Sequence, residues 1–177
     1  MLSRTTPWCV VSRLGFSWSQ KAGRRTLQGF SGEVGGSLRD KGPQIGAFME
    51  CKHAFVQEDV NIFAQICGDD NPLHTDVAVA KESMFGGTIV HGILVSSLFS
   101  TLFGRSLHGA VYVNQTLSFR RPVHVGTNVK ATIKILNKTK SRSGHLLTCS
   151  TVVELESGKI AVEGEAQCLL PYTEYPR

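Results

Sequence analysis

The second half of the chain alternates between apolar and polar positions with a period of two. Four segments follow this pattern: 111–120, 129–136, 147–155 and 160–170. Such alternation predicts strands of an antiparallel sheet that buries one face. Gly-containing turn sequences lie between the later segments, at 141–144 and 157–158. Because neighbouring strands follow one another through short connections, the pattern predicts an antiparallel meander.

The first half of the chain changes to helical periodicity. A short strand is expected at 48–56, followed by a helix over 57–67 whose apolar side chains recur at helical spacing. A further short helix is predicted over 77–82, capped at its start by Thr75 or Asp76. These elements lead into the longest apolar stretch of the chain.

That stretch, residues 90–104, predicts a long buried helix. It carries few charges around its circumference, so a sheet must wrap around it. One buried helix against about five strands is an α+β layer arrangement. A chain of 177 residues without internal repeats favours one domain with a full core. We therefore expect a single α+β domain over residues 47–171.

The net charge of +5 is confined to the N-terminal segment. Residues 1–32 hold five basic residues and no acidic one, whereas the basic and acidic residues that follow number 14 each. The basic pI is thus poor support for nucleic-acid binding. Scattered arginines without an apolar run indicate a presequence over 1–32, with the mitochondrial matrix favoured and an untargeted basic tail as the alternative. A Gly-rich linker over 33–46 and a tail over 172–177 flank the domain.

Five widely spaced cysteines form no CxxC pair, which supports neither a zinc knuckle nor a disulfide framework. Cys67 is expected to be a small buried thiol. No segment reaches the ~20 apolar residues that a membrane-spanning helix needs. The chain is therefore expected in a reducing compartment, with neither a membrane span nor a nucleic-acid partner.

The most informative stretch is Gly-Asp-Asp-Asn-Pro-Leu-His at 68–74. It places the carboxylate of Asp69 and the imidazole of His74 on one turn, where they can act as general acid and base. The buried helix that starts near Gly92 would present unpaired N–H groups and a partial positive charge. Together these features predict proton transfer on a carbonyl compound whose developing negative charge must be held.

Plainer interpretations stay open. Asx-Pro sequences are common turn formers, so residues 68–74 are compatible with an ordinary loop. His74, Asp76 and His91 can be considered as metal ligands, but their spacing is not distinctive and no metal is predicted. Four histidines are expected to be structural or exposed: His91, His108, His124 and His145.

Residues 63–74 resemble the signature of the (R)-specific enoyl-thioester hydratases, also called MaoC-like proteins. In that signature an apolar helix leads into Gly-Asp-x-Asn-Pro-x-His, and residues 90–94 are similar to the family's helix start. The resemblance covers about residues 48–171 and implies a hot-dog fold. It also implies reversible dehydration of (R)-3-hydroxyacyl thioesters to trans-2-enoyl thioesters, with no cofactor, on acyl carrier protein or coenzyme A. A homodimer and a step of mitochondrial fatty acid synthesis are the further expectations.

By position, the resemblance implies that Asp69 and His74 are the catalytic pair, with the division of proton transfer between them open. Gly92 would offer its backbone N–H to the thioester oxygen, and Asn71 would position the pair or the substrate. Ser100 would bond to and orient the Asp69 carboxylate. A hot-dog acyl thioesterase and a non-catalytic acyl-binding subunit are the alternative functions.

Four lysines lie at even-numbered positions of a predicted strand, which places them on one expected face: Lys130, Lys134, Lys138 and Lys140. A solvated sheet face is the plainer interpretation. The functional one is a docking surface, centred on Lys130 and Lys134, for an acidic carrier protein or the phosphates of coenzyme A.

Overall fold

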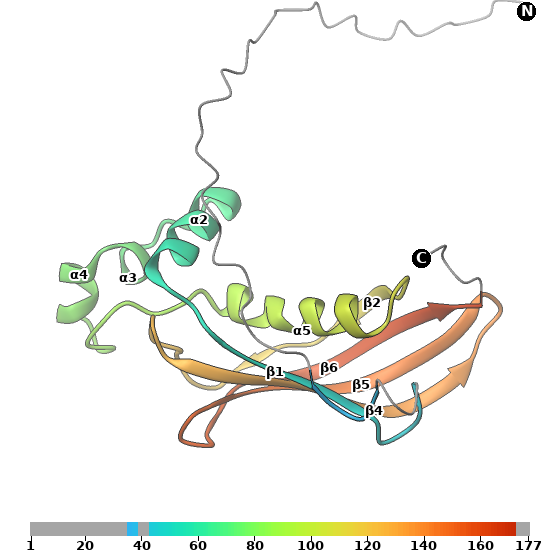
Figure 1. Cartoon of the computed structure of the whole chain (residues 1–177). Helices are drawn as coiled ribbons and strands as arrows, with labels where there is room; N and C mark the ends of the chain where they lie inside the picture. The colour runs from blue at the N-terminus through green and yellow to red at the C-terminus, as the bar shows by residue number, and fades with distance from the viewer. Residues whose placement is uncertain (1–34, 39–42, 173–177) are drawn as a thin grey trace, which may run out of the picture.

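The computed structural model describes residues 35–38 and 43–172, which fold into one curved antiparallel sheet and several helices (Figure 1). In chain order the elements are β1 (Phe48–Ala54), α2 (Gln57–Cys67), α3 (Pro72–Thr75), α4 (Val77–Glu82), α5 (Gly92–Ser106), β2 (Val111–Gln115), β3 (Ser118–Phe119), β4 (Asn128–Lys140), β5 (Gly144–Leu155) and β6 (Ile160–Pro171). The predicted helices over 57–67 and 77–82 are confirmed. None of the described helices is both long and apolar enough to span a bilayer.

The order of the strands is β1-β4-β5-β6-β2, with β3 also paired to β6. All pairs are antiparallel, which confirms the α+β class. The expected meander is correct only for β4, β5 and β6. The earlier strands β1 and β2 add to its opposite edges, because the helices between them carry the chain from one edge of the sheet to the other.

α5 lies along the concave face of the sheet, as Figure 1 shows, and supplies the centre of the core. Phe99 and Leu102 of this helix are fully buried together with Ile133, Ile135 and Leu147 of the sheet. The inward positions of β4 and β5 are the apolar ones of the alternating pattern, except for the buried Thr151 of β5. The pattern of the sequence therefore identifies the buried face of both strands correctly.

The segment predicted as one strand at 111–120 is divided and mostly exposed. β2 ends at Gln115 and β3 covers only two residues, with an irregular register between Tyr112 and Asn114. Val111, Tyr112 and Val113 are all exposed, so the alternation of β2 does not correspond to a buried face. β2 forms an edge of the sheet, and within the described residues its outer side has no strand partner.

The domain begins earlier than the expected start at residue 47. Gly35 exchanges two backbone hydrogen bonds of 3.0 Å with Glu50, and Leu38 is buried in the core. Gly36 adopts a positive φ of 126°, and a Cβ there would lie 2.2 Å from the carbonyl oxygen of Phe48. This glycine permits a close approach of two backbones rather than flexibility. Part of the expected linker over 33–46 is therefore packed on the sheet, whereas residues 1–32 lie outside the described residues.

A β-bulge changes which lysines share a face of β4. Ile135 lies opposite Cys149, but Asn137 lies opposite Thr148, so one extra residue is inserted between them. After the bulge, Lys138 lies opposite the buried Leu147. Because directly opposite residues of an antiparallel pair point to the same side, the alternation is reversed from that point. Lys138 and Lys140 therefore do not share the outward face of Lys130 and Lys134.

Candidate active site

The turn between α2 and α3 is built by its own polar side chains. Gly68 closes α2 through its N–H to the carbonyl oxygen of Ala64. The side chain of Asn71 then caps α3 by accepting the N–H of Leu73 at 3.0 Å, and Pro72 occupies the first helical position. Asn71 thus positions the turn that carries both predicted catalytic residues.

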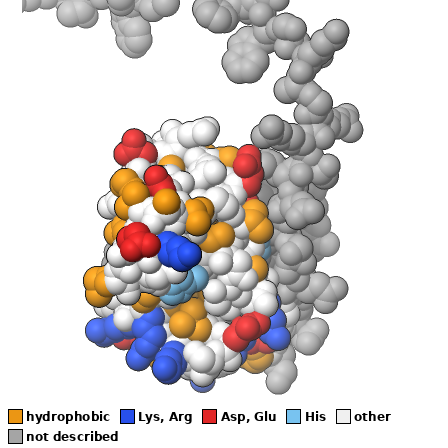
Figure 2. Space-filling view, turned by 90° about the vertical axis from the view of Figure 1, so that its left-hand side faces the viewer, with side chains coloured by type: hydrophobic (Ala, Val, Ile, Leu, Met, Phe, Trp, Pro, Cys, Tyr) orange, Lys and Arg blue, Asp and Glu red, His pale blue; other side chains and the backbone are white. Residues whose placement is uncertain are grey.

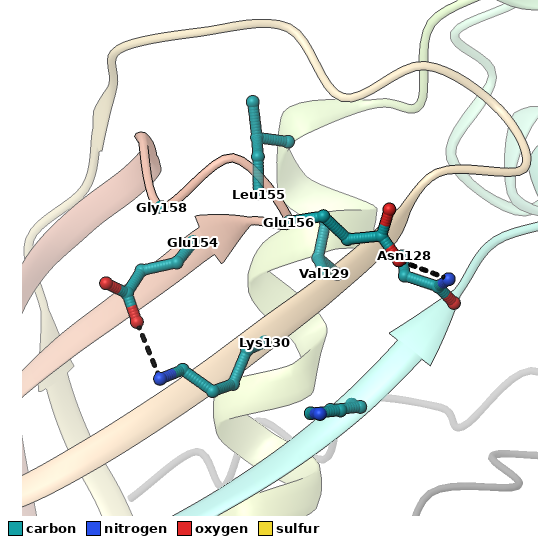
Figure 3. Close-up of a pocket in the computed structure, with 8 residues that line it drawn as sticks. Asn128, Val129, Lys130, Glu154, Leu155, Glu156 and Gly158 are labelled. Atoms are coloured by element: carbon teal, nitrogen blue, oxygen red, sulfur yellow. Dashed lines mark hydrogen bonds and ion pairs between the residues drawn. The ribbon is translucent and has the colours of Figure 1, made fainter.

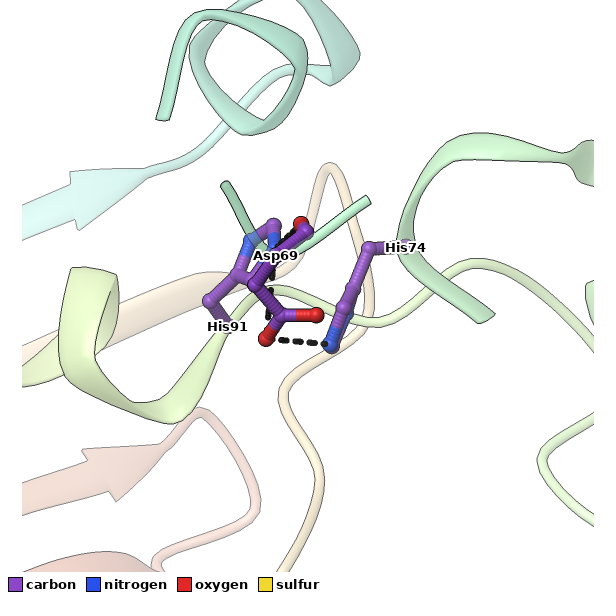
Figure 4. Close-up of side chains that lie close together, drawn as sticks. All are labelled: Asp69, His74 and His91. Carbon is purple, nitrogen blue, oxygen red and sulfur yellow. Dashed lines mark hydrogen bonds and ion pairs between the residues drawn. The ribbon is translucent and has the colours of Figure 1, made fainter. Parts of the chain in front are cut away.

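The structure brings Asp69 and His74 together (Figure 4). The Oδ2 atom of Asp69 lies 4.0 Å from the Nε2 atom of His74. The Asp69 side chain is 56% exposed, whereas that of His74 is only 14% exposed. The pair therefore combines a solvent-exposed carboxylate with a largely buried imidazole.

A backbone carbonyl determines the tautomer of His74. Its Nδ1 atom lies 2.7 Å from the carbonyl oxygen of Ile89. A carbonyl oxygen only accepts hydrogen bonds, so Nδ1 carries the ring proton in the neutral imidazole. The lone pair is then on Nε2, the atom that faces Asp69. This arrangement suits His74 to accept a proton from a bound molecule.

His91, one of the four histidines expected to be structural or exposed, is buried and belongs to the same cluster. Its ring is 3% exposed and stacks on His74 with centroids 3.8 Å apart. Its Nε2 donates to the backbone carbonyl oxygen of Asp69 at 2.9 Å and lies 3.9 Å from the Asp69 carboxylate. In the sequence, His91 is linked to the site by its position immediately before Gly92 and by the metal-ligand set considered with His74 and Asp76.

The N-terminus of α5 meets the cluster at Gly92. His91 is the residue before the helix and its side chain does not cap it. The first N–H groups of a helix have no partner within the helix, so Gly92 can offer its N–H to an anion. A Cβ on Gly92 would lie 2.6 Å from the half-exposed ring of Phe119, so a larger residue at this position would require that ring to shift.

Gly92 and His74 line one pocket of about 340 Å³. Its wall is largely apolar and includes Val90, Val95 and Val162, while Arg120 and Arg121 contribute two cationic side chains. Asn71 is not among its lining residues. The pocket therefore joins a proton acceptor, a helix N-terminus and an apolar surface.

The expected role of Ser100 in orienting Asp69 is not supported by any contact within the described residues of this chain. Ser100 is exposed on α5, and the described residues show no hydrogen bond between it and the carboxylate. Eight residues separate it from Gly92, which is about 12 Å along a helix axis. The Nε2–H of His91 holds the backbone of Asp69 instead, a contact that depends on the tertiary arrangement.

Asp69, His74 and His91 each have a possible metal-ligating atom, all within 4.8 Å of one another. This set differs from the one considered from the sequence, since Asp69 replaces Asp76. The Nε2 atom of His91 already donates to the carbonyl oxygen of Asp69. Only two donor atoms stay open, one fewer than the three protein ligands of a usual catalytic zinc site. The arrangement favours proton transfer over metal binding.

Lys130 and Lys134 lie on the opposite side of the sheet from this cluster. They alternate with the buried Val129, Ala131 and Ile133, which face α5. Figure 3 shows Lys130 in a separate hollow, where its Nζ lies 3.0 Å from a carboxylate oxygen of Glu154. That bond raises the pKa of Lys130. The structure does not bring the expected docking lysines to the candidate site.

The four described cysteines differ in exposure, and Cys67 is exposed rather than buried as expected. It lies at the end of α2, where its Sγ accepts the N–H of Asp69 at 3.4 Å. Burial raises the thiol pKa of Cys51 and Cys168 to about 11 and that of Cys149 to about 12. These three thiols are therefore structural.

A central helix wrapped by an antiparallel sheet, with an acid/base cluster at the helix N-terminus, defines a hot-dog protein of the hydratase type. The model of the MaoC like domain matches residues 41–156. The chain belongs to the MaoC-like family.

Two of its relatives illustrate the relationship. The chain is 37% identical over 130 residues to an (R)-specific enoyl-CoA hydratase from Aeromonas caviae, covering 72% of this chain and 96% of the relative. It is 32% identical to a mitochondrial 3-hydroxyacyl-[acyl-carrier-protein] dehydratase, FERN, from Solanum lycopersicum, covering 72% and 78%.

Solved structures agree with this assignment. The (R)-hydratase from A. caviae superimposes with a TM-score of 0.70 at 36% identity, covering 74% of this chain and 99% of that protein. The R-hydratase PhaJ1 from Pseudomonas aeruginosa gives a TM-score of 0.69 at 28% identity, covering 82% and 97%. The expected hot-dog fold is thereby confirmed.

Proposed function

We propose that this protein is a hydro-lyase that reversibly dehydrates (R)-3-hydroxyacyl thioesters to trans-2-enoyl thioesters. The observation that carries the proposal is the open Nε2 atom of His74, placed beside Asp69 and in one pocket with Gly92. Its relatives named as dehydratases and (R)-specific hydratases support the same chemistry.

In dehydration, His74 removes the proton from C2 of the substrate through Nε2. Negative charge then develops on the thioester oxygen, and the N–H of Gly92 at the start of α5 stabilises it. Asp69, in its protonated form, donates its proton to the 3-hydroxyl group, which leaves as water. The helix N-terminus stabilises charge without any rearrangement of the protein.

Because the two groups are close together, their starting protonation states can be restored after each turnover. After one turnover His74 holds the proton from C2 and Asp69 is an anion, with Oδ2 and Nε2 4.0 Å apart. Transfer of that proton from His74 to Asp69 returns both groups to their starting states. In hydration the same steps run in reverse, with Asp69 orienting the attacking water.

A homodimer through β2 is part of the proposal. The outer side of this edge strand is unpaired within the described residues, and Val111, Tyr112 and Val113 are exposed on it. Unpaired apolar edges are favourable sites for pairing with a second copy. At the opposite edge, Gly35 already pairs with β1. A Val113→Lys variant should shift the protein toward monomer in sedimentation, and an unchanged dimer would exclude this edge.

We place the activity in the mitochondrial matrix, at the carrier-protein dehydratase step of fatty acid synthesis. The support is the acid-free basic segment over 1–32 and the tomato and Arabidopsis thaliana relatives that are named mitochondrial. Fusion of residues 1–32 to a fluorescent reporter tests the targeting. Reporter spread through the cytosol would exclude it.

The decisive experiment mixes the full chain with a trans-2-enoyl-CoA and follows loss of the conjugated enoyl absorbance. The wild type should form the (R)-3-hydroxy product, whereas Asp69→Asn and His74→Ala should each be slower by about 10²–10⁴-fold. Asp70→Asn, which changes the neighbouring exposed carboxylate, is the matched control. Release of free thiol would favour the thioesterase alternative. Binding without turnover would favour the acyl-binding alternative.

A further inference from the structure

Two exposed arginines follow β3 directly, and each makes a side-chain hydrogen bond to another part of the fold. The Nε of Arg120 donates to a carboxylate oxygen of Glu163 at 2.7 Å, and the Nη1 of Arg121 donates to the carbonyl oxygen of Ile160 at 2.7 Å. A guanidinium has five N–H donors, so each arginine keeps most of them available. Both guanidinium groups therefore keep N–H donors that can bind a ligand.

The charge of this pair is only partly neutralised. Glu163 compensates Arg120, but the bond of Arg121 is to a neutral carbonyl group. Among the residues that the structure describes, no carboxylate pairs with Arg121. Figure 2 views the end of the molecule that carries α3 and α4, and on this face Lys and Arg side chains gather below a histidine.

Arg120 and Arg121 line the same pocket as His74 and Gly92, together with the apolar side chains described above. The pocket thus has an apolar part and a cationic part. An acyl thioester has the same division, because an apolar acyl group is joined through a pantetheine arm to a phosphate. A planar guanidinium binds phosphate oxygens through paired hydrogen bonds.

We propose that Arg120 and Arg121 bind the 4′-phosphate of the pantetheine arm that carries the acyl group. The proposal rests on the thioester function argued above. This phosphate is common to coenzyme A and acyl carrier protein, so one subsite serves both carriers. Lys130 and Lys134, on the far face of the sheet, have no part in it.

The test compares three carriers of one trans-2-enoyl group: pantetheine, 4′-phosphopantetheine and coenzyme A. For the wild type, KM should be lower for the two phosphorylated carriers than for pantetheine. In Arg120→Gln/Arg121→Gln, KM for both phosphorylated carriers should rise about tenfold or more. KM for the pantetheine thioester should change less than KM for the two phosphorylated carriers, because pantetheine has no phosphate with which to lose contact. Lys130→Gln/Lys134→Gln is the matched control and should behave as the wild type.

Each other outcome overturns the proposal. An equal rise of KM for all three carriers would mean that the arginines act on folding or catalysis. A rise of KM for coenzyme A alone would indicate contact with its other phosphates. A rise of KM in the lysine variant alone would mean that the carrier binds to the outer face of the sheet. Calorimetric binding of 4′-phosphopantetheine against pantetheine needs no turnover, so it separates failure of this subsite from failure of the proposed reaction.

Discussion

The chemistry of the candidate site depends on two backbone carbonyls as much as on its side chains. The carbonyl oxygen of Ile89 holds the ring proton of His74 on Nδ1, and the carbonyl oxygen of Asp69 accepts from His91. The first contact leaves a basic nitrogen facing Asp69, and the second fixes the backbone from which the carboxylate projects. His91 is accordingly a positioning residue.

His91→Phe tests this role. Phenylalanine keeps a ring that can stack on His74 but has no N–H for the Asp69 carbonyl. The buried Nδ1 of His91 has no partner within the described residues, so its removal offsets part of the lost hydrogen bond. We expect kcat to fall roughly tenfold while the unfolding free energy changes by less than about 1 kcal/mol. Equal kcat for variant and wild type would refute the role.

The control for that variant is His124→Phe. His124 also binds a backbone carbonyl, that of Phe85 at 2.9 Å, but it has no contact with Asp69 or His74 among the interactions of the described residues. It should affect stability without the selective loss of kcat. A loss of kcat in both variants would mean that any loosened loop impairs the enzyme.

Gly92→Ala should displace Phe119. The added Cβ would lie 2.6 Å from the Phe119 ring, closer than atoms in contact can approach. Because the Phe119 ring is 53% exposed and can shift, the cost should lie near the lower end of about 1–3 kcal/mol, and the melting temperature should fall together with activity. Phe119→Leu in the Gly92→Ala background removes the clash and should restore much of the stability. If the double variant is no more stable than Gly92→Ala, the ring is not the obstacle.

At the scale of elements, hydrogen bonds of nearby residues determine where a helix starts and ends. Asp76 accepts the N–H groups of Ala78 and Val79 at 2.8 and 3.1 Å, which starts α4 as one of the two predicted caps. Asp76 also ends α3, where its N–H donates to the carbonyl oxygen of Pro72. Asp76 therefore connects α3, the helix that carries His74, to α4.

Asp76→Ala should reduce the unfolding free energy by about 1 kcal/mol, the usual value of a helix cap. Asp76→Asn keeps an acceptor oxygen and should retain most of the stability. Urea unfolding of the two variants distinguishes capping from charge. Equal destabilisation by both would assign the effect to the carboxylate charge.

Helices and strands could be predicted where the residues adjacent in the sequence determine their structure. The helix over 57–67 and the strands β5 and β6 follow from periodicity alone, because their buried faces repeat at regular intervals. α3 was not predicted as a helix, since four residues cannot show a period. The bulge in β4 was also missed, because it is defined by the register of β5, which periodicity within one strand cannot show.

At the scale of the whole molecule, strand order sets which residues meet. β1 and β4 are neighbours although the helices, β2 and β3 separate them in the chain, and this pairing buries Met49 and Cys51 against the core. The same arrangement encloses His53, whose ring packs edge-on against Phe55 at 4.5 Å. Burial lowers the pKa of His53 below its ordinary value.

This burial gives the stability a pH dependence. Below about pH 6.5 the unfolded chain binds a proton at His53 that the folded state resists, so the unfolding free energy falls as the pH is lowered. His53→Gln should make the decline between pH 7 and pH 5, roughly the histidine range, shallower. His108→Gln, at an exposed position, is the control. Parallel declines for wild type and His53→Gln would contradict the assignment.

The sequence by itself determined the α+β class and most element positions, and it predicted that Asp69, His74 and Gly92 belong to one site, because periodicity, turn chemistry and a short signature are local properties. The tertiary structure alone decided the tautomer of His74 and the contact of His91 with Asp69. It also placed Arg120 and Arg121 in the pocket of His74 and put Lys130 on the opposite face. These are contacts and separations between segments far apart in the chain, which follow from strand order and register and not from local pattern.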